Sequence, residues 1–178
     1  MDTFKPQLAM LREELESLPE LNLPEGYSVR GFQDGDEAAW ERIIQDSFGG
    51  ERKFDSHMRR DPEYRPERVR FICCHGEPVA TASAWYSGEW GADTGCLHMV
   101  GILSSHAGKG IGSIVSLAAM HQMKREGRTR AVLRTDDFRI PAIKSYWKLG
   151  YKPYLVHENQ VERWRAIGEK LGIPLSVQ

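Results

Sequence analysis

The feature that most restricts the fold of this chain is the segment "SSHAGKGIGSIV", residues 104–115, which joins a β-rich run to a helix-like stretch. Glycine inside a helix or strand is less favourable than alanine by roughly 0.5–1 kcal/mol, so glycines at alternate positions 108, 110 and 112 need a structural reason. A strand that enters a tight turn at a helix N-terminus provides one, because the exposed N–H groups and the helix dipole there attract an anion. The segment predicts such a turn, and a plain tight loop is the alternative.

Two other glycine-rich motifs do not match this segment. A phosphate loop of nucleotide hydrolases needs Gly-x-x-x-x-Gly-Lys-Ser/Thr, whereas Lys109 is followed by Gly110 and Leu103 stands at the first glycine position. A dinucleotide fingerprint needs Gly-x-Gly-x-x-Gly with an acidic residue at the end of the following strand. The chain has Gly-x-Gly-x-Gly, and the following run "RAVLRT" brings no acidic residue to that place.

Composition indicates one ordinary globular domain and excludes several partners. The chain has 178 residues, 40% hydrophobic and 28% charged, with a net charge of −1. No overall field attracts nucleic acid or an anionic membrane, so neither partner is expected. Residues 1–18 match neither a secretory leader nor a spanning segment, which predicts a cytoplasmic protein. Cys73, Cys74 and Cys96 lack metal-ligand spacing, which predicts buried thiols and no metal site.

Hydrophobic periodicity divides the chain into three parts. Residues 1–24 are predicted to be an N-terminal helix and linker, since leucines 8, 11, 15 and 18 recur at helical spacing. Residues 25–158 form the core, and residues 159–178 contain a closing helix. Within the core, strands are expected at 27–32, 68–74, 78–87, 94–103, 130–135 and 151–156, and helices at 34–48, 54–60, 111–127 and 138–150. The order predicts an α/β fold with a mixed sheet.

Two motifs together resemble a known superfamily. "SSHAGKGIGSIV" followed by "PAIKSYWKLGY" resembles the GNAT superfamily of acyl-CoA N-acyltransferases, whose signature is Arg/Gln-x-x-Gly-x-Gly/Ala at a strand-to-helix turn and then Asn-x-x-Ala-x-x-x-Tyr-x-x-x-Gly-Phe/Tyr. The resemblance extends over about residues 27–154 and is greatest to the bacterial branch with mycothiol synthase-like proteins. It implies a single GNAT domain over residues 1–178, a mostly antiparallel mixed sheet flanked by helices, and acetyl-CoA as co-substrate.

The chain departs from the signature at two positions. Ala107 stands where Arg or Gln is usual, and Arg139 stands where Asn is usual. Arg139 could restore the lost polar contact by donating to a phosphate or a pantetheine carbonyl, or the pair could mark an altered cofactor preference. His106 and Lys109 could bring further charge to the phosphates.

The resemblance also implies the cofactor contacts. The strand before the turn separates from its parallel neighbour and binds pantetheine through its backbone, which by position means Val100, Ile102 and Leu103. Gly101 fits a bulge or a close approach. The diphosphate is then bound by amides at the turn, those of Gly108, Lys109, Gly110, Gly112 and Ser113.

Tyr146 matches the motif tyrosine, which the resemblance makes the proton donor to the leaving thiolate. The alternative for Tyr146 is a half-buried helix residue that packs on the sheet. The general base is less clear, because no carboxylate occurs in residues 97–103. His98 lies on the right strand and has a suitable intrinsic pKa, although a single His on a strand is more often structural. The alternatives to His98 as the general base are a water chain and the side chains Glu89, Asp93, Asp136 and His157.

Two groups of residues are candidates for the acceptor side. Trp85, Tyr86 and Trp90 surround the loop "SGEWGADTG" and could line a pocket or belong to the core. The basic stretch "HMRRDPEYRPERVR", residues 57–70, could receive an acidic acceptor or form a solvated face.

The function predicted is transfer of an acetyl group from acetyl-CoA to a primary amine by direct attack in a ternary complex. No cysteine is well placed to act as a nucleophile, and Cys96 lies too many residues before the turn. The acceptor is a small-molecule or peptide amine, and a homodimer is left open. The alternative function is a non-catalytic acyl-CoA-binding regulatory module with the same fold.

Overall fold

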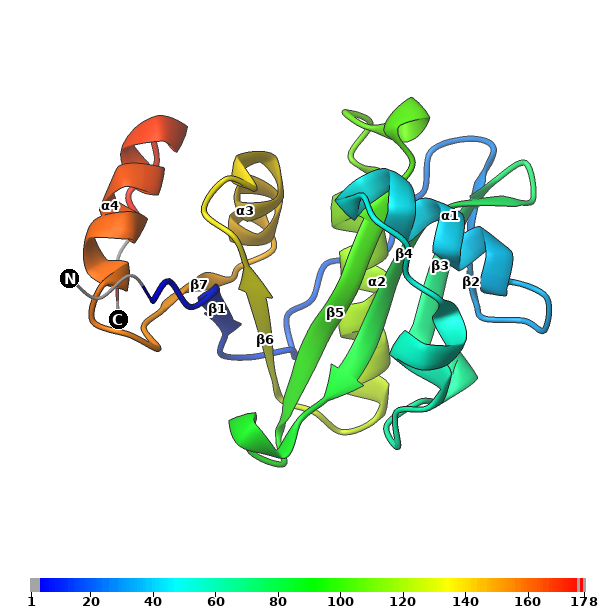
Figure 1. Cartoon of the computed structure of the whole chain (residues 1–178), viewed down its shortest axis with the longest axis horizontal. Helices are drawn as coiled ribbons and strands as arrows, with labels where there is room; N and C mark the ends of the chain where they lie inside the picture. The colour runs from blue at the N-terminus through cyan, green and yellow to red at the C-terminus, as the bar shows by residue number, and fades with distance from the viewer. Residues whose placement is uncertain (1–3, 176, 178) are drawn as a thin grey trace.

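A seven-stranded sheet of order β2-β3-β4-β5-β6-β1-β7 carries the fold of this chain (Figure 1). The computed structural model describes residues 4–175 and 177. Its strands are β1 (Leu8–Arg12), β2 (Tyr27–Gly31), β3 (Val69–Cys74), β4 (Glu77–Tyr86), β5 (Thr94–Ile102), β6 (Arg130–Thr135) and β7 (Lys152–Tyr154). In the described part of the chain, β5 and β6 are parallel and the other neighbouring strands are antiparallel. The predicted α/β fold with a mostly antiparallel mixed sheet is confirmed.

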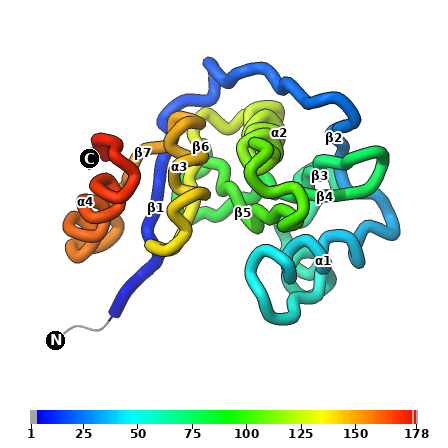
Figure 2. Tube along the Cα trace, turned by 90° about the horizontal axis from the view of Figure 1, so that it is seen from above, coloured from blue at the N-terminus to red at the C-terminus, as the bar shows by residue number. Residues whose placement is uncertain are grey.

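Helices cover the sheet on both faces. The α-helices are α1 (Glu37–Phe48), α2 (Ile111–Arg125), α3 (Ile140–Lys148) and α4 (Gln160–Leu171), and short helical turns lie at Asp55–Arg59, Pro66–Arg68, Gly88–Trp90 and Ser104–His106. Figure 2 shows α1 and α2 on opposite sides of β4 and β5, with α3 beside α2 and α4 at the β7 end. The predicted closing helix at the C-terminus is confirmed.

Alternation along the strands produces two cores, one on each face. On β3, Val69, Phe71 and Cys73 are buried with Trp40 and neighbouring residues of α1, whereas Ile72 is buried on the α2 side. Successive side chains of a strand point to opposite faces, so one strand supplies both cores. The buried residues of α2, α3 and α4 belong to the same core as Ile72.

The predicted N-terminal helix is wrong. Leu8–Arg12 is strand β1, which pairs with β6 through Leu8 and Thr135 and with β7 through Ala9 and Tyr154. All of its residues are buried, because the strand lies inside the sheet and is covered on both faces. A short run that is apolar throughout is typical of such a strand, and the leucine spacing imitates a helix by coincidence.

Local signals place most of the other elements within a few residues. Asp36 occupies the N-cap position of α1, but its carboxylate accepts from the Gln33 amide at 2.7 Å and from Arg30 at 2.6 Å instead of capping the helix. Gly127 follows α2 and Gly150 follows α3, both with positive φ, as expected for glycine at a helix end. In the described part of the chain, no helix has the length and apolarity needed to cross a bilayer.

Candidate functional site

The parallel strands β5 and β6 separate at one end of the sheet. Their register ends with Leu97 opposite Leu133, although β5 continues to Ile102. On its other side, β5 carries a bulge against β4 between His98 and Gly101, and Met99 within it has a φ of +50°. A bulge bends its strand, so the far half of β5 is left with one edge that has no strand partner.

The N-terminus of α2 presents unpaired amides beside this edge. In residues 4–175 and 177, the N–H groups from Gly108 to Ser113 have no acceptor, and the first bond into the helix runs from Ile114 N to Gly110 O at 3.2 Å. Gly110 is the N-cap residue with a φ of +76°, and it has no side chain to satisfy these donors. The space over Gly108 and Gly110 is open to 4 Å. Unpaired main-chain amides at a helix N-terminus are the arrangement that suits an anion.

Gly112 lets the Ile102 side chain pack closely on α2. A Cβ at this position would lie 2.5 Å from Cδ1 of Ile102, so a larger residue at position 112 requires the end of the Ile102 side chain to move. This contact sets the N-terminus of α2 directly against the free edge of β5.

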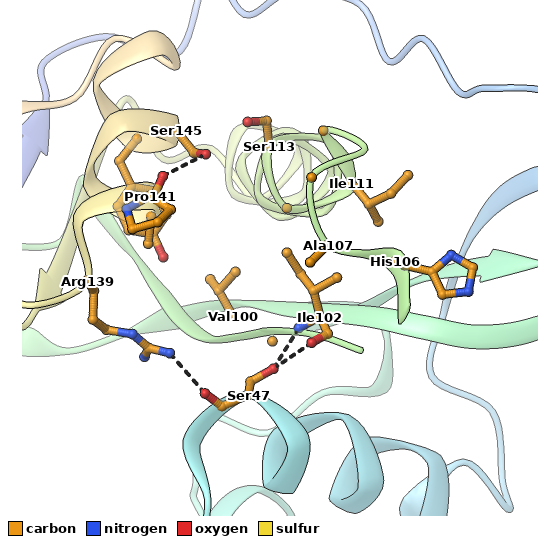
Figure 3. Close-up of a pocket in the computed structure, with 16 residues that line it drawn as sticks. Ser47, Val100, Ile102, His106, Ala107, Ile111, Ser113, Arg139, Pro141 and Ser145 are labelled. Carbon is orange, nitrogen blue, oxygen red and sulfur yellow. Dashed lines mark hydrogen bonds between the residues drawn. The ribbon is translucent and has the colours of Figure 1, made fainter. Parts of the chain in front are cut away.

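A cavity of about 460 Å³ lies between α2, β5 and α3. Figure 3 shows Ile111 and Ser113 of α2 on one side, Val100 and Ile102 of β5 on the other, and Arg139 and His106 toward opposite ends. Pro141, Ser145 and Tyr146 enclose it from α3, while Ser47 enters from α1. We call this space the glycine-turn cavity.

The structure corrects the expectation that the amides of Ile102 and Leu103 are free. Ile102 N donates to Ser47 Oγ at 2.8 Å, and the same hydroxyl donates to Ile102 O at 3.0 Å. Leu103 N donates to Val79 O at 2.9 Å, as an extension of the β4–β5 ladder. Val100 lies in the bulge, where the register of the described strands gives it no partner on β4, and it lines the cavity. Val100 is thus the available backbone contact of the three.

A second cavity of about 430 Å³ adjoins the first. It fills the space where β5 and β6 separate, and Val100, Arg139 and Tyr146 line both cavities. We call this space the strand-end cavity. Its other polar and aromatic lining residues are Gln7, Phe48, Arg52, Trp90, Cys96, His98, Arg134, Thr135 and Asp136.

Tyr146 lies at the junction of the cavities. It is 9% exposed, and no residue of the described chain hydrogen-bonds its hydroxyl. Burial raises the pKa of Tyr146 to about 12, which keeps the phenol protonated near neutral pH. The hydroxyl is therefore available as a donor to a group at the junction.

His98 lies on the strand-end cavity, where burial lowers the pKa of its imidazole. Its ring lies 5.7 Å from that of Trp85, and Trp85 Nε1 donates to Asp61 at 3.0 Å. A lowered pKa leaves the ring neutral at pH 7, which is the form that can accept a proton.

The other candidate bases are in different positions. Asp136 lines the strand-end cavity and accepts from Gln7 Nε2 at 3.2 Å. Glu89 lines neither cavity and is paired with Arg134, while Asp93 is also outside both and bonds the Thr94 hydroxyl at 3.0 Å. His157 lies by the ring of Phe4, away from the lining of both cavities.

The aromatic candidates divide between core and cavity. Trp85 is buried in the core on the α1 face, and Tyr86 packs under Arg128, whose Cζ is 4.2 Å from the ring centroid. Trp90 lines the strand-end cavity. The basic run at 57–70 lines neither cavity. Two of its arginines are neutralised within the protein, since Arg59 pairs with Glu37 and Arg68 pairs with Glu63 and Glu126.

Arg139 lines the glycine-turn cavity but lies away from position 107. Its guanidinium lies 4.0 Å from the Phe48 ring centroid and donates to Ser47 O at 3.3 Å, at the end of the cavity away from Ala107 and His106 (Figure 3). His106 Nδ1 is hydrogen-bonded to the Tyr27 hydroxyl at 2.7 Å, and the backbone on either side of Lys109 lines the glycine-turn cavity.

Sequence reasoning missed Ser47, Phe48 and Arg52, which lie at the end of α1 and just beyond it. Neither a motif nor the periodicity of α1 distinguishes them, since α1 reaches the site only by packing across β4 and β5.

Comparison with known proteins agrees with this geometry. Residues 37–151 match the model of the acetyltransferase (GNAT) family. This chain belongs to the GNAT family. Mycothiol acetyltransferase of Thermomonospora curvata is 27% identical over 161 residues, covering 84% of this chain and 52% of that protein. The Streptomyces coelicolor mycothiol acetyltransferase is 26% identical over 163 residues, covering 87% and 52%.

Solved GNAT structures share the fold. A GCN5-related N-acetyltransferase from Kribbella flavida has a TM-score of 0.60 at 24% identity, covering 84% of this chain and 55% of that chain. The ribosomal-protein-S18-alanine N-acetyltransferase from Escherichia coli has a TM-score of 0.56 at 17% identity, covering 70% and 76%. This GNAT chain spans about half the length of the curated relatives it matches.

Proposed function

We propose that this chain binds acetyl-CoA in the glycine-turn cavity and transfers the acetyl group to a primary amine held in the strand-end cavity. The observation that carries the proposal is the run of unpaired amides from Gly108 to Ser113 beside a cavity that adjoins a second one at Tyr146. Mycothiol acetyltransferases among its relatives support the acetyl donor.

The cofactor would lie along β5 from the turn to the junction. The amides of Gly108, Lys109, Gly110, Gly112 and Ser113 would donate to the diphosphate, with the α2 dipole adding to the attraction. The Val100 backbone would bind the pantetheine arm, and the Ile102 side chain would pack against it. This arrangement brings the thioester to the residues shared by both cavities.

The reaction would proceed by direct attack. After the ammonium has lost one proton to solvent, the neutral nitrogen forms a bond to the thioester carbon, and the carbon–sulfur bond breaks. The second proton of the nitrogen passes to the neutral His98 imidazole, and the thiolate leaves while it accepts a hydrogen bond from Tyr146. A cysteine route has little support, because burial raises the pKa of Cys96 to about 11 and keeps this cavity-lining thiol protonated.

The proposal is tested by measuring coenzyme A binding and acetyl transfer separately. Calorimetry should detect binding of coenzyme A and acetyl-CoA, and a thiol-release assay over a library of primary amines should detect turnover with some of them. Binding without thiol release for any amine would support the regulatory module in place of the enzyme. Failure to bind coenzyme A at millimolar concentration would refute both functions.

We assign the base to His98 and expect a pH profile that reports its lowered pKa. The neutral imidazole is the active form, so kcat at saturating acceptor should stay level near neutral pH and fall as pH drops through a midpoint below 6.5. His98→Gln should lower kcat about a hundredfold or more and remove this acid limb. Asp136→Asn is the matched control. If the acid limb of the kcat profile persists in H98Q but disappears in D136N, the general base is Asp136 and not His98.

A further inference from the structure

The guanidinium groups of two arginines lie over the same aromatic ring in the strand-end cavity. The Cζ atom of Arg52 lies 5.3 Å from the centroid of the Phe48 ring, and that of Arg139 lies 4.0 Å from it. Arg52 follows α1 and Arg139 precedes α3, so the tertiary fold alone brings them together. Both line the strand-end cavity, and stacking on Phe48 orients their planar faces.

Neither guanidinium has a carboxylate partner in the described part of the chain. Each makes one backbone hydrogen bond there, Arg139 to Ser47 O at 3.3 Å and Arg52 to Gly49 O at 2.8 Å. Those carbonyls are at the C-terminal end of α1, where the helix dipole favours a cation, which explains where the two groups sit. A guanidinium has five N–H donors, so most of the donors of Arg52 and Arg139 are left without protein acceptors.

The other charged groups that line the strand-end cavity are one paired arginine and one carboxylate without a cationic partner in the described residues. Arg134 is neutralised by Glu89, whereas the Asp136 carboxylate accepts only from the Gln7 amide within the described residues. His98 is neutral at pH 7 because burial lowers its pKa. The cavity therefore presents two unneutralised cations and one unneutralised carboxylate, which complements a ligand with an ammonium and an anionic group.

We propose that the acceptor is a small aminocarboxylate, with its carboxylate bound by Arg52 and Arg139 and its amine directed to the junction at Tyr146. A planar carboxylate matches the fork of donors on a guanidinium. Asp136 attracts the ammonium before it loses its proton. The inference rests on the proposed function, because it names the substrate class of the same site.

The test compares each acceptor with close analogues that lack the carboxylate. The probes are glycine, L-leucine and L-phenylalanine, the corresponding α-carboxamides, the decarboxylated amines and O-phosphoethanolamine. Thiol release from acetyl-CoA gives kcat and KM for each, and calorimetry on the coenzyme A-loaded protein gives equilibrium binding. Arg52→Gln is the test variant. Arg42→Gln is its control. Arg42 lies on α1, donates to Pro78 O at 3.3 Å and, like Arg52, has no ion pair in the described residues, yet it lines neither cavity of the site.

We expect at least one free acid to be favoured over its carboxamide by tenfold or more in kcat/KM, the range of a charge-assisted hydrogen bond. Arg52→Gln should raise KM for that acid about tenfold or more, leave coenzyme A affinity and the melting temperature within error, and erase the preference over the amide. Arg42→Gln should change none of these.

Several results would overturn the inference. Equal use of acids and carboxamides by the wild-type protein, a preference for decarboxylated amines or O-phosphoethanolamine, or an equal effect of R52Q on acids and amides would each exclude carboxylate recognition here. Without turnover, calorimetry decides: acid-selective binding that R52Q abolishes supports the anion site while the transferase proposal fails. Absence of both turnover and acid-selective binding rejects both.

Discussion

Replacing Gly110 by valine should weaken coenzyme A binding by a hundredfold or more and leave the fold intact. Gly110 has a φ of +76°, and its missing side chain leaves the space over the turn open. Valine strains this conformation and places its methyl groups where the diphosphate would contact the amides. Hydrogen bonds to charged groups contribute about 1.5–3 kcal/mol each, so losing two of them gives at least this factor. Calorimetry with coenzyme A measures the change.

Gly35→Val is the matched control for backbone strain. Gly35 has a φ of +99° and no atom within 4 Å of the position that a Cβ would take, but its turn precedes α1 and lines neither cavity. Both variants should lower the melting temperature by similar small amounts, while only Gly110→Val loses affinity. Unchanged coenzyme A affinity in G110V would show that the diphosphate does not bind at the N-terminus of α2, and the proposed position of the cofactor would be wrong.

Tyr146→Phe should lower kcat about 10- to 100-fold and leave coenzyme A affinity within twofold. The phenol has a pKa of about 12, whereas a thiol ordinarily has one of about 8.5. Because burial makes the phenol hold its proton more firmly than an ordinary phenol, we expect its contribution to be a hydrogen bond to the developing charge on sulfur. Such a bond contributes about 1.5–3 kcal/mol, which sets the expected range. Single-turnover acetyl transfer with a good acceptor measures it.

Tyr151→Phe is the matched control for loss of a buried hydroxyl. The rings of Tyr146 and Tyr151 lie 6.1 Å apart, and the Tyr151 hydroxyl is buried without a partner in the described structure. Tyr151 lines neither cavity, so its hydroxyl cannot reach the reacting atoms. Y151F should keep wild-type kcat and be at least as stable, because an unsatisfied buried polar group is removed. Equal losses of kcat in Y146F and Y151F would reduce Tyr146 to a packing residue.

Local patterns were sufficient for most of the fold. The spacing of Ala39, Ile43 and Phe48 predicts α1, and Gly127 and Gly150 mark the ends of α2 and α3, because these signals act between residues close in the chain. Residues 8–12 were predicted as helix and are strand β1. Their conformation is decided by β6 and β7, which lie more than a hundred residues away along the chain.

Some residues of the candidate site could likewise be predicted from local patterns, and others could not. The glycine turn, His98 and Tyr146 could be proposed from motifs, since each belongs to a short segment with its own spacing. Ser47, Phe48 and Arg52 could not, because they reach the site from the opposite face of the sheet. The pairing of Ile102 N with Ser47 Oγ likewise joins residues from separate segments.

By itself, the amino-acid sequence determined that a strand enters a glycine turn and continues as a helix, which is where an anion can bind main chain. The tertiary structure decided that two cavities adjoin at Tyr146, that the Ile102 amide is already occupied, and that Arg52 and Arg139 both lie over the Phe48 ring. The physical reason is range: turn and helix preferences arise between near neighbours in the chain, whereas a cavity and its charges arise from segments brought together by burial of apolar surface.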